Sequence, residues 1–208
     1  MARSFTEREK ENIKRKLQEA CRQSWTQYGY KKTGVDELCR LAGISKGAFY
    51  LFFESKEALF CEVLCSVQKE ICEAALKVME RQKGRDGVAA ALKLIYREYD
   101  NHNFLYDSNS ADFAILMNKL SEEQAGRIEE SNEMCRQLFL NHPYLKLKVD
   151  SDLALSVIYS LIMNIKNKDV LPYNHRETFS FMVDHLVESL FIDLEKEAEN
   201  ENGNCKKK

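Results

Sequence analysis

The side chains best suited to chemistry in the amino-terminal quarter lie in one short run, which reads AGISKGAFYLFFESKEALF. Ser45 and Lys46 place a hydroxyl beside an ammonium group, Ser55 and Lys56 repeat that pair, and Tyr50 adds a phenol between them. Hydroxyl and ammonium groups bind phosphate oxygens, and a lysine can also reach the edge of a guanine. The run therefore predicts contacts with a nucleic acid.

Short helices separated by a tight turn are needed to present these groups. Apolar residues recur at helical spacing over residues 35–42 and stop at Gly43, and Ser45 is a suitable N-cap for a second short helix over residues 45–53. This pattern predicts a helix-turn-helix, in which the second short helix enters the major groove of DNA. A helix of about two turns is unstable alone, so Phe49 and Phe53 are expected to anchor it by burial.

The start of the second short helix would lie nearest to the bases. Small side chains at Gly47 and Ala48 let the backbone approach, and the Ala48 methyl group can touch a thymine methyl group. The helix expected from Ser55 offers free N–H groups and its dipole to a phosphate, to which Lys56 adds charge. The residues predicted to bind DNA are Thr33, Gly34, Ser45, Lys46, Gly47, Ala48, Tyr50, Leu51 and Lys56.

The charge distribution agrees with that prediction. The first 56 residues carry 12 Lys or Arg against 7 Asp or Glu, a surplus of +5, although the whole chain of 208 residues has a net charge of −2. A basic head on an acidic body is typical of a nucleic-acid-binding domain joined to a domain that does not bind nucleic acid. No apolar run approaches the ~20 residues that cross a bilayer, and the start lacks a signal-peptide core. We expect a cytoplasmic protein with no membrane partner.

The cysteines leave a second interpretation open. There are 7, an odd number, mostly within apolar helical stripes, so reduced and buried thiols are expected rather than a disulfide framework. Cys61, Cys65 and Cys72 share one side of a helix, which leaves a thiol- or metal-responsive regulator as an alternative. A helical interaction module that does not bind DNA is another alternative. Phosphate loops, nucleophile elbows and zinc-protease motifs are missing, so we expect no enzyme, no cofactor and no metal.

The remainder of the chain predicts further helices and no strands. With only 2 Pro and 8 Gly, the sequence favours an all-α fold. A first helix is expected from Thr6 to about Gly29, because Thr6 and Glu9 have the spacing of a capping box. The clearest break is at residues 84–87, and helices are expected over about 88–104, 111–118, 121–141, 150–165 and 174–194, with Ser121 and Gln124 as a second capping box. The last two are apolar around much of their circumference, which is typical of burial on two sides. They predict a dimer interface formed by Leu153, Val157, Leu161, Phe179, Val183, Leu186 and Leu190.

Residues 33–60 resemble the DNA-binding domain of the TetR family of bacterial transcriptional regulators. The residues that carry the resemblance are Thr33, Val35, Ala42, Gly43, Ser45, Gly47, Tyr50, Phe53, Ser55, Lys56, Glu57 and Leu59. The departures are Gly34 in place of a second Thr, Cys39 in place of Ala, Leu51 in place of Tyr, and Phe52 in place of His. They leave open whether positions 51 and 52 contact DNA.

The resemblance implies a three-helix DNA-binding domain at residues 1–56 and a helical effector-binding and dimerisation domain at 57–198, with residues 55–83 linking the two. The polar composition of residues 199–208 predicts a flexible tail. It implies a homodimeric repressor that binds a palindromic operator on double-stranded DNA and is released by an unknown small-molecule effector. Aromatic and methionine residues of the body are the candidate effector contacts: Tyr96, Tyr99, Phe104, Tyr106, Phe113, Met117, Phe139, Tyr159 and Met163. The acidic body and these rings suggest an apolar or cationic effector.

Overall fold

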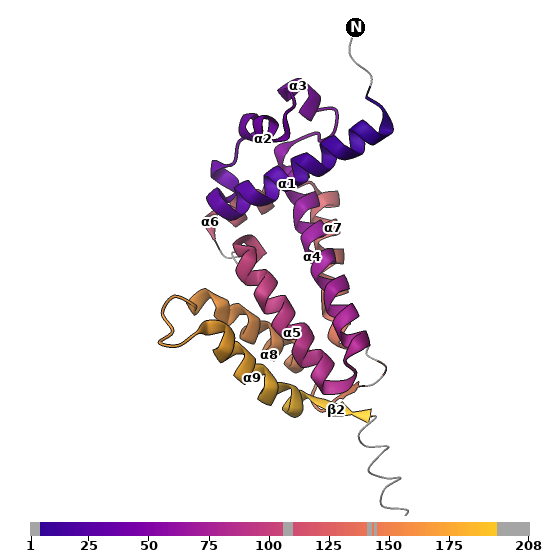
Figure 1. The fold of residues 1–208 in the computed structure, drawn as a ribbon, viewed down its shortest axis with the longest axis vertical. Helices are drawn as coiled ribbons and strands as arrows, with labels where there is room; N and C mark the ends of the chain where they lie inside the picture. Colours follow the sequence, from indigo (N-terminus) through magenta and orange to yellow (C-terminus); the bar gives the residue numbers. More distant parts are fainter. Residues whose placement is uncertain (1–4, 106–109, 141–142, 144, 195–208) are drawn as a thin grey trace, which may run out of the picture. The chain divides into compact units, whose positions relative to one another are not determined.

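The computed structural model describes residues 5–105, 110–140, 143 and 145–194, and these are predominantly helical (Figure 1). The all-α prediction is confirmed. Tyr106, the expected helix end near residue 141 and the tail predicted at 199–208 lie outside the described residues.

The described residues divide into two compact units. The first comprises residues up to 67 together with 102–131, and the second comprises 68–101 together with the residues from 132 onward. Two long helices, α4 (Lys56–Arg81) and α7 (Glu122–Leu140), contribute residues to both units. The domain boundary expected at residue 56 coincides with the start of α4 and lies inside the first unit.

The first unit begins with the expected helix, α1 (Glu7–Lys32). Thr6 and Glu9 form the predicted capping box, in which each side chain bonds to the backbone of the other residue. The helix is kinked at Gly29, whose φ of 80° lies in the left-handed region that favours glycine. Asp112 packs against this kink, with Oδ2 only 2.6 Å from the place where a Cβ of residue 29 would lie. The close approach therefore also requires glycine.

The helix-turn-helix follows as α2 (Val35–Ala42) and α3 (Lys46–Phe49). Gly43 ends α2 in the left-handed conformation with φ of 71°, and Ser45 caps α3 by accepting a hydrogen bond from the backbone N–H of Ala48. The second helix is shorter than the expected span of residues 45–53. Its chain turns after Phe49, whose carbonyl oxygen accepts from the N–H groups of both residues 52 and 53.

Helices η1 (Asn103–Leu105) and α6 (Ala111–Met117) complete the first unit with parts of α4 and α7. Trp25 of α1 lies at the centre of the core, where its ring stacks on Phe104 at 4.3 Å and meets Phe60 at 4.6 Å between centroids. Helix α7 begins at the predicted capping box, because Ser121 and Gln124 exchange side-chain and backbone hydrogen bonds.

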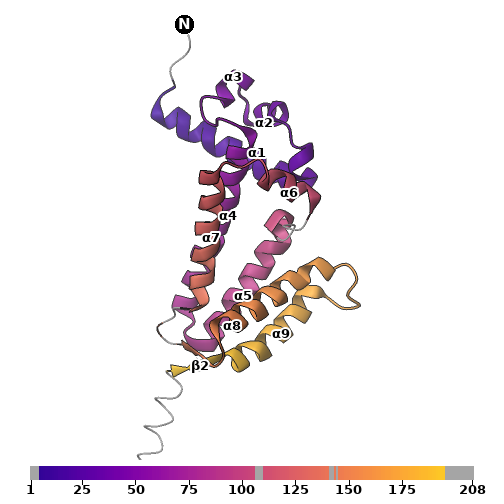
Figure 2. The ribbon, with the colours of Figure 1, turned by 180° about the vertical axis from the view of Figure 1, so that it is seen from behind.

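The second unit contains α5 (Gly84–Asn101), α8 (Ser151–Met163), η2 (Asn164–Asn167) and α9 (His175–Leu190). The expected break at residues 84–87 is instead the first turn of α5. Asp193 makes this start possible, since its carboxylate accepts a hydrogen bond from the backbone N–H of Arg85. Figures 1 and 2 show α5, α8 and α9 packed beside one another, and Tyr96 of α5 stacks on Phe179 of α9 with 3.8 Å between centroids.

The prediction of no strands is wrong. Two three-residue strands, β1 (Leu145–Leu147) and β2 (Phe191–Asp193), pair in antiparallel register, with residue 145 opposite 193. The second strand replaces the end of the helix that the apolar pattern extended to residue 194. Strands of this length are too short to produce a readable alternation of side chains, and their pairing is non-local.

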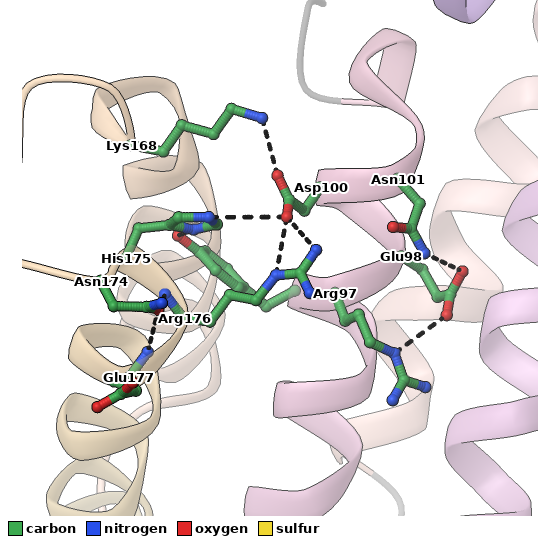
Figure 3. A network of polar contacts seen from close by, with 10 residues as sticks. Arg97, Glu98, Asp100, Asn101, Lys168, Asn174, His175, Arg176 and Glu177 are labelled. Atoms are coloured by element: carbon green, nitrogen blue, oxygen red, sulfur yellow. Dashed lines mark hydrogen bonds and ion pairs between the residues drawn. The ribbon is translucent and has the colours of Figure 1, made fainter.

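A buried carboxylate ties the end of α5 to η2 and α9 (Figure 3). Asp100, whose side chain is 9% exposed, accepts hydrogen bonds from Lys168 Nζ at 2.8 Å and Arg176 Nε at 2.9 Å, while His175 Nε2 lies 3.7 Å away. Burial by itself would raise the pKa of Asp100, but the hydrogen bonds from Lys168 and Arg176 outweigh it and lower that pKa. The Asp100 cluster, defined by these four residues, therefore holds its carboxylate in the ionised form.

The expectation that all cysteines are reduced is also wrong. Cys72 of α4 and Cys135 of α7 form a disulfide. The sequence placed each on an apolar helical stripe but could not show that the stripes face each other across 63 residues. Cys21, Cys39 and Cys61 are buried free thiols, as expected.

Candidate nucleic-acid interface

The predicted DNA-binding residues of α3 form one exposed edge. Ser45, Lys46 and Gly47 are exposed at the start of the helix, and Tyr50 and Leu51 follow with 51% and 72% of their surface accessible. Ala48 is half-buried between them. This set, residues 45–48 with 50 and 51, is called the recognition edge below.

Two phenylalanines hold the recognition edge in place, as the sequence predicted. Phe49 is fully buried and Phe53 is 4% exposed, and their ring centroids lie 5.9 Å apart. Burying a phenylalanine side chain contributes about 1.5–3 kcal/mol. That contribution offsets the instability of a helix that has only four residues.

Lys46 is already paired in the absence of DNA. Its Nζ lies 3.0 Å from Oδ1 of Asp36 on α2, and this hydrogen bond raises the pKa of Lys46. Both side chains are more than half exposed, at 56% and 79%. Exposed ion pairs contribute roughly 0–1 kcal/mol, so a phosphate or a guanine edge can compete with Asp36 for the ammonium group. The sequence pattern did not reveal this ion pair, which joins α2 to α3 through two residues that are ten positions apart.

Lys56 has a partner of another kind. Its Nζ donates a 2.6 Å hydrogen bond to the carbonyl oxygen of Tyr30 and lies 3.9 Å from the centroid of the Tyr30 ring. Burial lowers the pKa of Lys56. The ammonium group therefore caps the end of α1, a structural role that the sequence did not reveal, and its predicted phosphate contact stays a prediction.

A cluster behind Lys56 was also missed from the sequence. The Tyr30 hydroxyl donates a short hydrogen bond to Glu57, and Lys119 Nζ lies 3.7 Å from the same carboxylate. Burial, followed by the hydrogen bond to Glu57, raises the pKa of Tyr30. The cluster fixes the end of α1 to the first turn of α4 and to residue 119 within the first unit, so it positions the helix-turn-helix from behind.

Thr33 and Gly34, two of the residues predicted to bind DNA, lie in the turn before α2 and differ in exposure. Thr33 is 1% exposed, and its hydroxyl donates to the carbonyl oxygen of Gly29 at 2.7 Å, so it serves as the C-cap of α1. Gly34 is exposed and precedes α2 as its N-cap. Of this pair, only the backbone of Gly34 is open to a phosphate in the described structure.

The two apolar departures from the family pattern differ in environment. Phe52 is half-buried, and its ring lies 6.0 Å from that of Phe5 ahead of α1. Leu51 is the more exposed of the two, at 72%, and projects from the recognition edge beside Tyr50. Phe52 has therefore become a packing residue, whereas Leu51 remains available for contact.

A comparison with known families agrees with this geometry. Residues 17–63, which contain the recognition edge and its supporting helices, match the family described as "Bacterial regulatory proteins, tetR family". The amino-terminal part of the chain is a TetR-family DNA-binding domain. This confirms the resemblance seen in the sequence and agrees with the expectation of a regulator rather than an enzyme.

Two curated sequences match parts of the chain. The chain is 42% identical over 67 residues to the uncharacterised HTH-type transcriptional regulator YhgD of Bacillus subtilis, an alignment that covers 32% of the chain and 35% of YhgD. It is 26% identical over 150 residues to the uncharacterised HTH-type transcriptional regulator YuxN of the same organism, covering 72% of the chain and 44% of YuxN. The alignments thus span less than half of these curated relatives.

A solved structure extends the likeness in fold to most of the chain. The transcriptional regulator FadR from Bacillus subtilis, solved in complex with stearoyl-CoA, matches 84% of this chain and 98% of its own length with a TM-score of 0.63. The sequences are 14% identical. The comparison therefore supports the fold and does not assign a ligand.

The residues predicted to contact an effector are distributed over both units. Phe104, Phe113 and Met117 belong to the first unit, and the other described candidates belong to the second: Tyr96, Tyr99, Phe139, Tyr159 and Met163. Tyr96 and Phe139 are buried core residues, whereas Tyr159 is 56% exposed on α8. Burial raises the pKa of Tyr99 to about 12. The described structure does not gather this set around one cavity.

One cavity of about 410 Å³ does lie in the first unit. Phe104 and Phe113 line it with the carboxyl-terminal part of α1, where Asp112 accepts a 2.9 Å hydrogen bond from the backbone N–H of Lys31. Asn103, also in its wall, donates to the carbonyl oxygen of Thr26 at 3.0 Å. The cavity is thus bounded by fixed polar contacts on two sides, and two of the predicted aromatics form part of its apolar wall.

The predicted dimer residues separate into two groups. Phe179, Val183 and Leu190 are no more than 5% exposed within the single chain, because they form the core of the second unit. The prediction was wrong to place those side chains on an outer face. The other members remain accessible: Leu153, Val157, Leu161 and Leu186. The last three line a shallow depression of about 550 Å³ formed by α8 and α9.

The structure bears on the alternative that Cys61, Cys65 and Cys72 together sense a thiol-reactive compound or bind a metal. Cys72 is engaged with Cys135, and the part of the chain that the structure describes holds no group of three or more metal-ligating side chains. A hydrogen bond from Cys61 lowers the pKa of Cys65 to about 7, and the same bond with burial raises the pKa of Cys61.

Among the described helices, none is long and apolar enough to span a bilayer.

Proposed function

We propose that the chain is a sequence-specific DNA-binding repressor that acts as a homodimer. The observation that carries this proposal is the recognition edge, an exposed row of small, cationic and hydroxylated side chains held by buried Phe49 and Phe53. The surplus of +5 over the first 56 residues adds a sequence-independent attraction to phosphates. Each protomer would place one recognition edge in the major groove of a palindromic operator.

The open face of α8 and α9 is proposed as the dimer interface. Val157, Leu161 and Leu186 line its depression, and Leu153 lies exposed on the same helix pair. Exposed leucines are individually ordinary, but apolar residues gathered in one depression are typical of an association site. Dimer symmetry would set the two recognition edges about one DNA turn, ~34 Å, or a small multiple apart.

Release by an effector is the regulatory part of the proposal. An apolar or cationic small molecule bound in the helical body would act only through a higher affinity for a conformer with the wrong spacing between recognition edges. Helix α4 is the proposed element of change, because it is a continuous helix from Lys56, beside the helix-turn-helix, to Arg81. The stearoyl-CoA of FadR supports an apolar ligand as the first class to test.

The test begins with selection of bound duplexes from a random-sequence pool, followed by fluorescence anisotropy on the selected site. We expect a palindromic site, and loss of its binding on Lys46→Ala or Tyr50→Ala without a change in dimerisation or melting temperature. Lys69→Ala is the matched control, because Lys69 is a 67% exposed lysine of α4 in the second unit. Parent-like affinity in both edge variants would show that the recognition edge does not read DNA.

The interface is tested separately by sedimentation equilibrium. Leu161→Glu places a charge in the depression and should give monomers, whereas Leu76→Glu, at a 45% exposed leucine of α4, should leave the dimer intact. A dimer that survives Leu161→Glu would move the interface away from α8 and α9.

A further inference from the structure

Helices α4 and α7 lie side by side in both views of the ribbon (Figures 1 and 2). The face that α4 turns toward α7 carries Cys61, Cys65, Gln68 and Cys72, which are spaced by four, three and four residues and so share one side of the helix. We call these four residues the thiol seam. Three of its four members are cysteines, a composition that ordinary helix packing does not require.

Each residue of the thiol seam meets α7 at nearly the same offset in sequence. In the first unit, Cys61 Sγ lies 3.5 Å from the carbonyl oxygen of Gln124, and Cys65 Sγ lies 3.7 Å from that of Arg127. The sequence separations are 63 and 62 residues, so the two helices run parallel.

The second unit continues the pattern. Gln68 Nε2 donates to Oδ1 of Asn132 at 2.9 Å across a separation of 64 residues, and Cys72 is bonded to Cys135 across 63. The Cα atoms of the two cysteines are 6.0 Å apart. Disulfides form at Cα separations of about 4.4–6.8 Å, so the helices hold this pair at bonding distance without a change in backbone.

The cysteine pair is accessible from one side. Cys72 is 3% exposed, whereas Cys135 is partly exposed on α7. Cys135 is therefore the member of the pair that lies nearer to solvent, which suits it as the reactive cysteine, with buried Cys72 as the resolving one.

The contact next to the disulfide, between Gln68 of α4 and Asn132 of α7, leaves one buried polar atom unsatisfied while the two helices are packed together. The Oε1 atom of Gln68 is buried and has no hydrogen-bond partner among the described residues. An unsatisfied buried acceptor destabilises the closed contact, because separation of the helices would return it to water. The closed seam therefore depends in part on the Cys72–Cys135 bond.

We propose that Cys72 and Cys135 form a reversible redox site that takes peroxide-class oxidants and dithiol reductants. Disulfides in the reducing compartment that holds bacterial DNA are usually transient and redox-sensing. The inference that the protein works in this compartment rests on the DNA-binding function proposed above. Closure cross-links α4 to α7 within the second unit, and reduction releases them.

The chemistry balances with these partners. In oxidation, the Cys135 thiolate attacks one oxygen of hydrogen peroxide to give a sulfenic acid, and the departing hydroxide takes a proton to become water. The Cys72 thiolate then attacks the Cys135 sulfur and expels hydroxide, which forms a second water. In reduction, a dithiol attacks Cys135 Sγ, Cys72 leaves and is protonated, and the second thiol of the reductant closes its own disulfide to release Cys135.

The test uses the full chain without DNA, so failure of the redox site and failure of DNA binding are distinguishable. The native chain is equilibrated in mixtures of reduced and oxidised dithiothreitol, alkylated and mapped by mass spectrometry. We expect Cys72 and Cys135 to lose and regain alkylation together, and hydrogen peroxide to restore their link after reduction. Alkylation of both at every poise, or reduction only after denaturation, would overturn the proposal.

Melting temperature supplies a second measurement. Opening a cross-link that spans 63 residues should lower the melting temperature of the parent by roughly 10 °C. Cys72→Ser and Cys135→Ser should each abolish this redox-dependent shift, and Cys65→Ser, in the same seam, should retain it. A shift that disappears in Cys65→Ser or persists in Cys72→Ser would assign the redox chemistry to other cysteines. The alkylation map of the parent remains decisive if a serine variant fails to fold.

Discussion

Replacement of Asp100 by asparagine is the most informative test of how the second unit is held together. The substitution keeps the size of the side chain and removes the negative charge that Lys168, His175 and Arg176 surround (Figure 3). Asp100 is 9% exposed in its side chain, so the cations would lose a counter-ion that water replaces poorly. We expect the variant to fold with reduced stability.

The magnitude follows from the contacts of the Asp100 cluster. A hydrogen bond to a charged group contributes roughly 1.5–3 kcal/mol, and Lys168 and Arg176 each donate to the carboxylate. Solvent screens both cations, which are 26% and 50% exposed, and the asparagine oxygen can still accept one bond. The expected loss in the free energy of unfolding is therefore about 2–3 kcal/mol, or about 5–10 °C in melting temperature.

The pH dependence gives the prediction its sign. Because the pKa of Asp100 is lowered in the folded state, its contribution to stability is complete above the unfolded pKa of ~3.9 and is lost as pH falls through the folded value. The difference between parent and Asp100→Asn should thus be full at pH 7 and shrink at acidic pH below ~4.

Urea unfolding followed by circular dichroism at pH 7 and at several acidic values measures both quantities. Glu177→Gln is the control, since Glu177 is an exposed carboxylate of α9 that bonds to exposed Tyr173 and should change stability by less than ~0.5 kcal/mol. A loss below ~1 kcal/mol at pH 7, or one that does not diminish in acid, would refute this account of the Asp100 cluster.

Three further predictions concern the first unit. Lys56→Met keeps the stem of the side chain but loses the hydrogen bond to the Tyr30 carbonyl oxygen, so we expect thermal melts to show about 1–2 kcal/mol less stability. An unchanged melting temperature, together with a salt dependence of DNA affinity that is shallower by about one unit, would instead assign Lys56 to a phosphate contact. Gly29→Ala should cost more than ~1 kcal/mol in urea unfolding because of its φ of 80° and the nearby Asp112, and parent-like stability would contradict the kinked structure. Phe49→Ala should cost about 3–5 kcal/mol and abolish DNA binding measured by anisotropy, whereas binding that survives would mean that burial of Phe49 does not hold the recognition edge.

Local signals account for the elements that were predicted well. Thr6 with Glu9 and Ser121 with Gln124 are capping boxes, which act within one helical turn and can be read directly. Gly43 is likewise a local stop signal, because glycine adopts the left-handed conformation easily. The recognition edge depends on such local rules, so its position follows from the sequence.

Contacts between distant residues account for what was missed. The strand pair joins residues 145 and 193, and the inward faces of Phe179 and Val183 depend on how α5 packs against α9. A wide apolar stripe shows that a helix is buried but not which of its sides meets its own chain. The effector candidates met the same obstacle, since aromatic spacing does not reveal whether a ring fills a core or lines a cavity.

Sequence alone predicts the helix-turn-helix, its caps, the two anchoring phenylalanines and the basic surplus, because each follows from spacing within a few residues or from composition. The packed fold was needed to show that Lys56 bonds to the end of α1, that Asp100 gathers Lys168, His175 and Arg176, and that Cys72 meets Cys135. These pairings join residues that are 26 to 76 positions apart. Their geometry is set by the packing of whole helices, which no local pattern of side chains encodes.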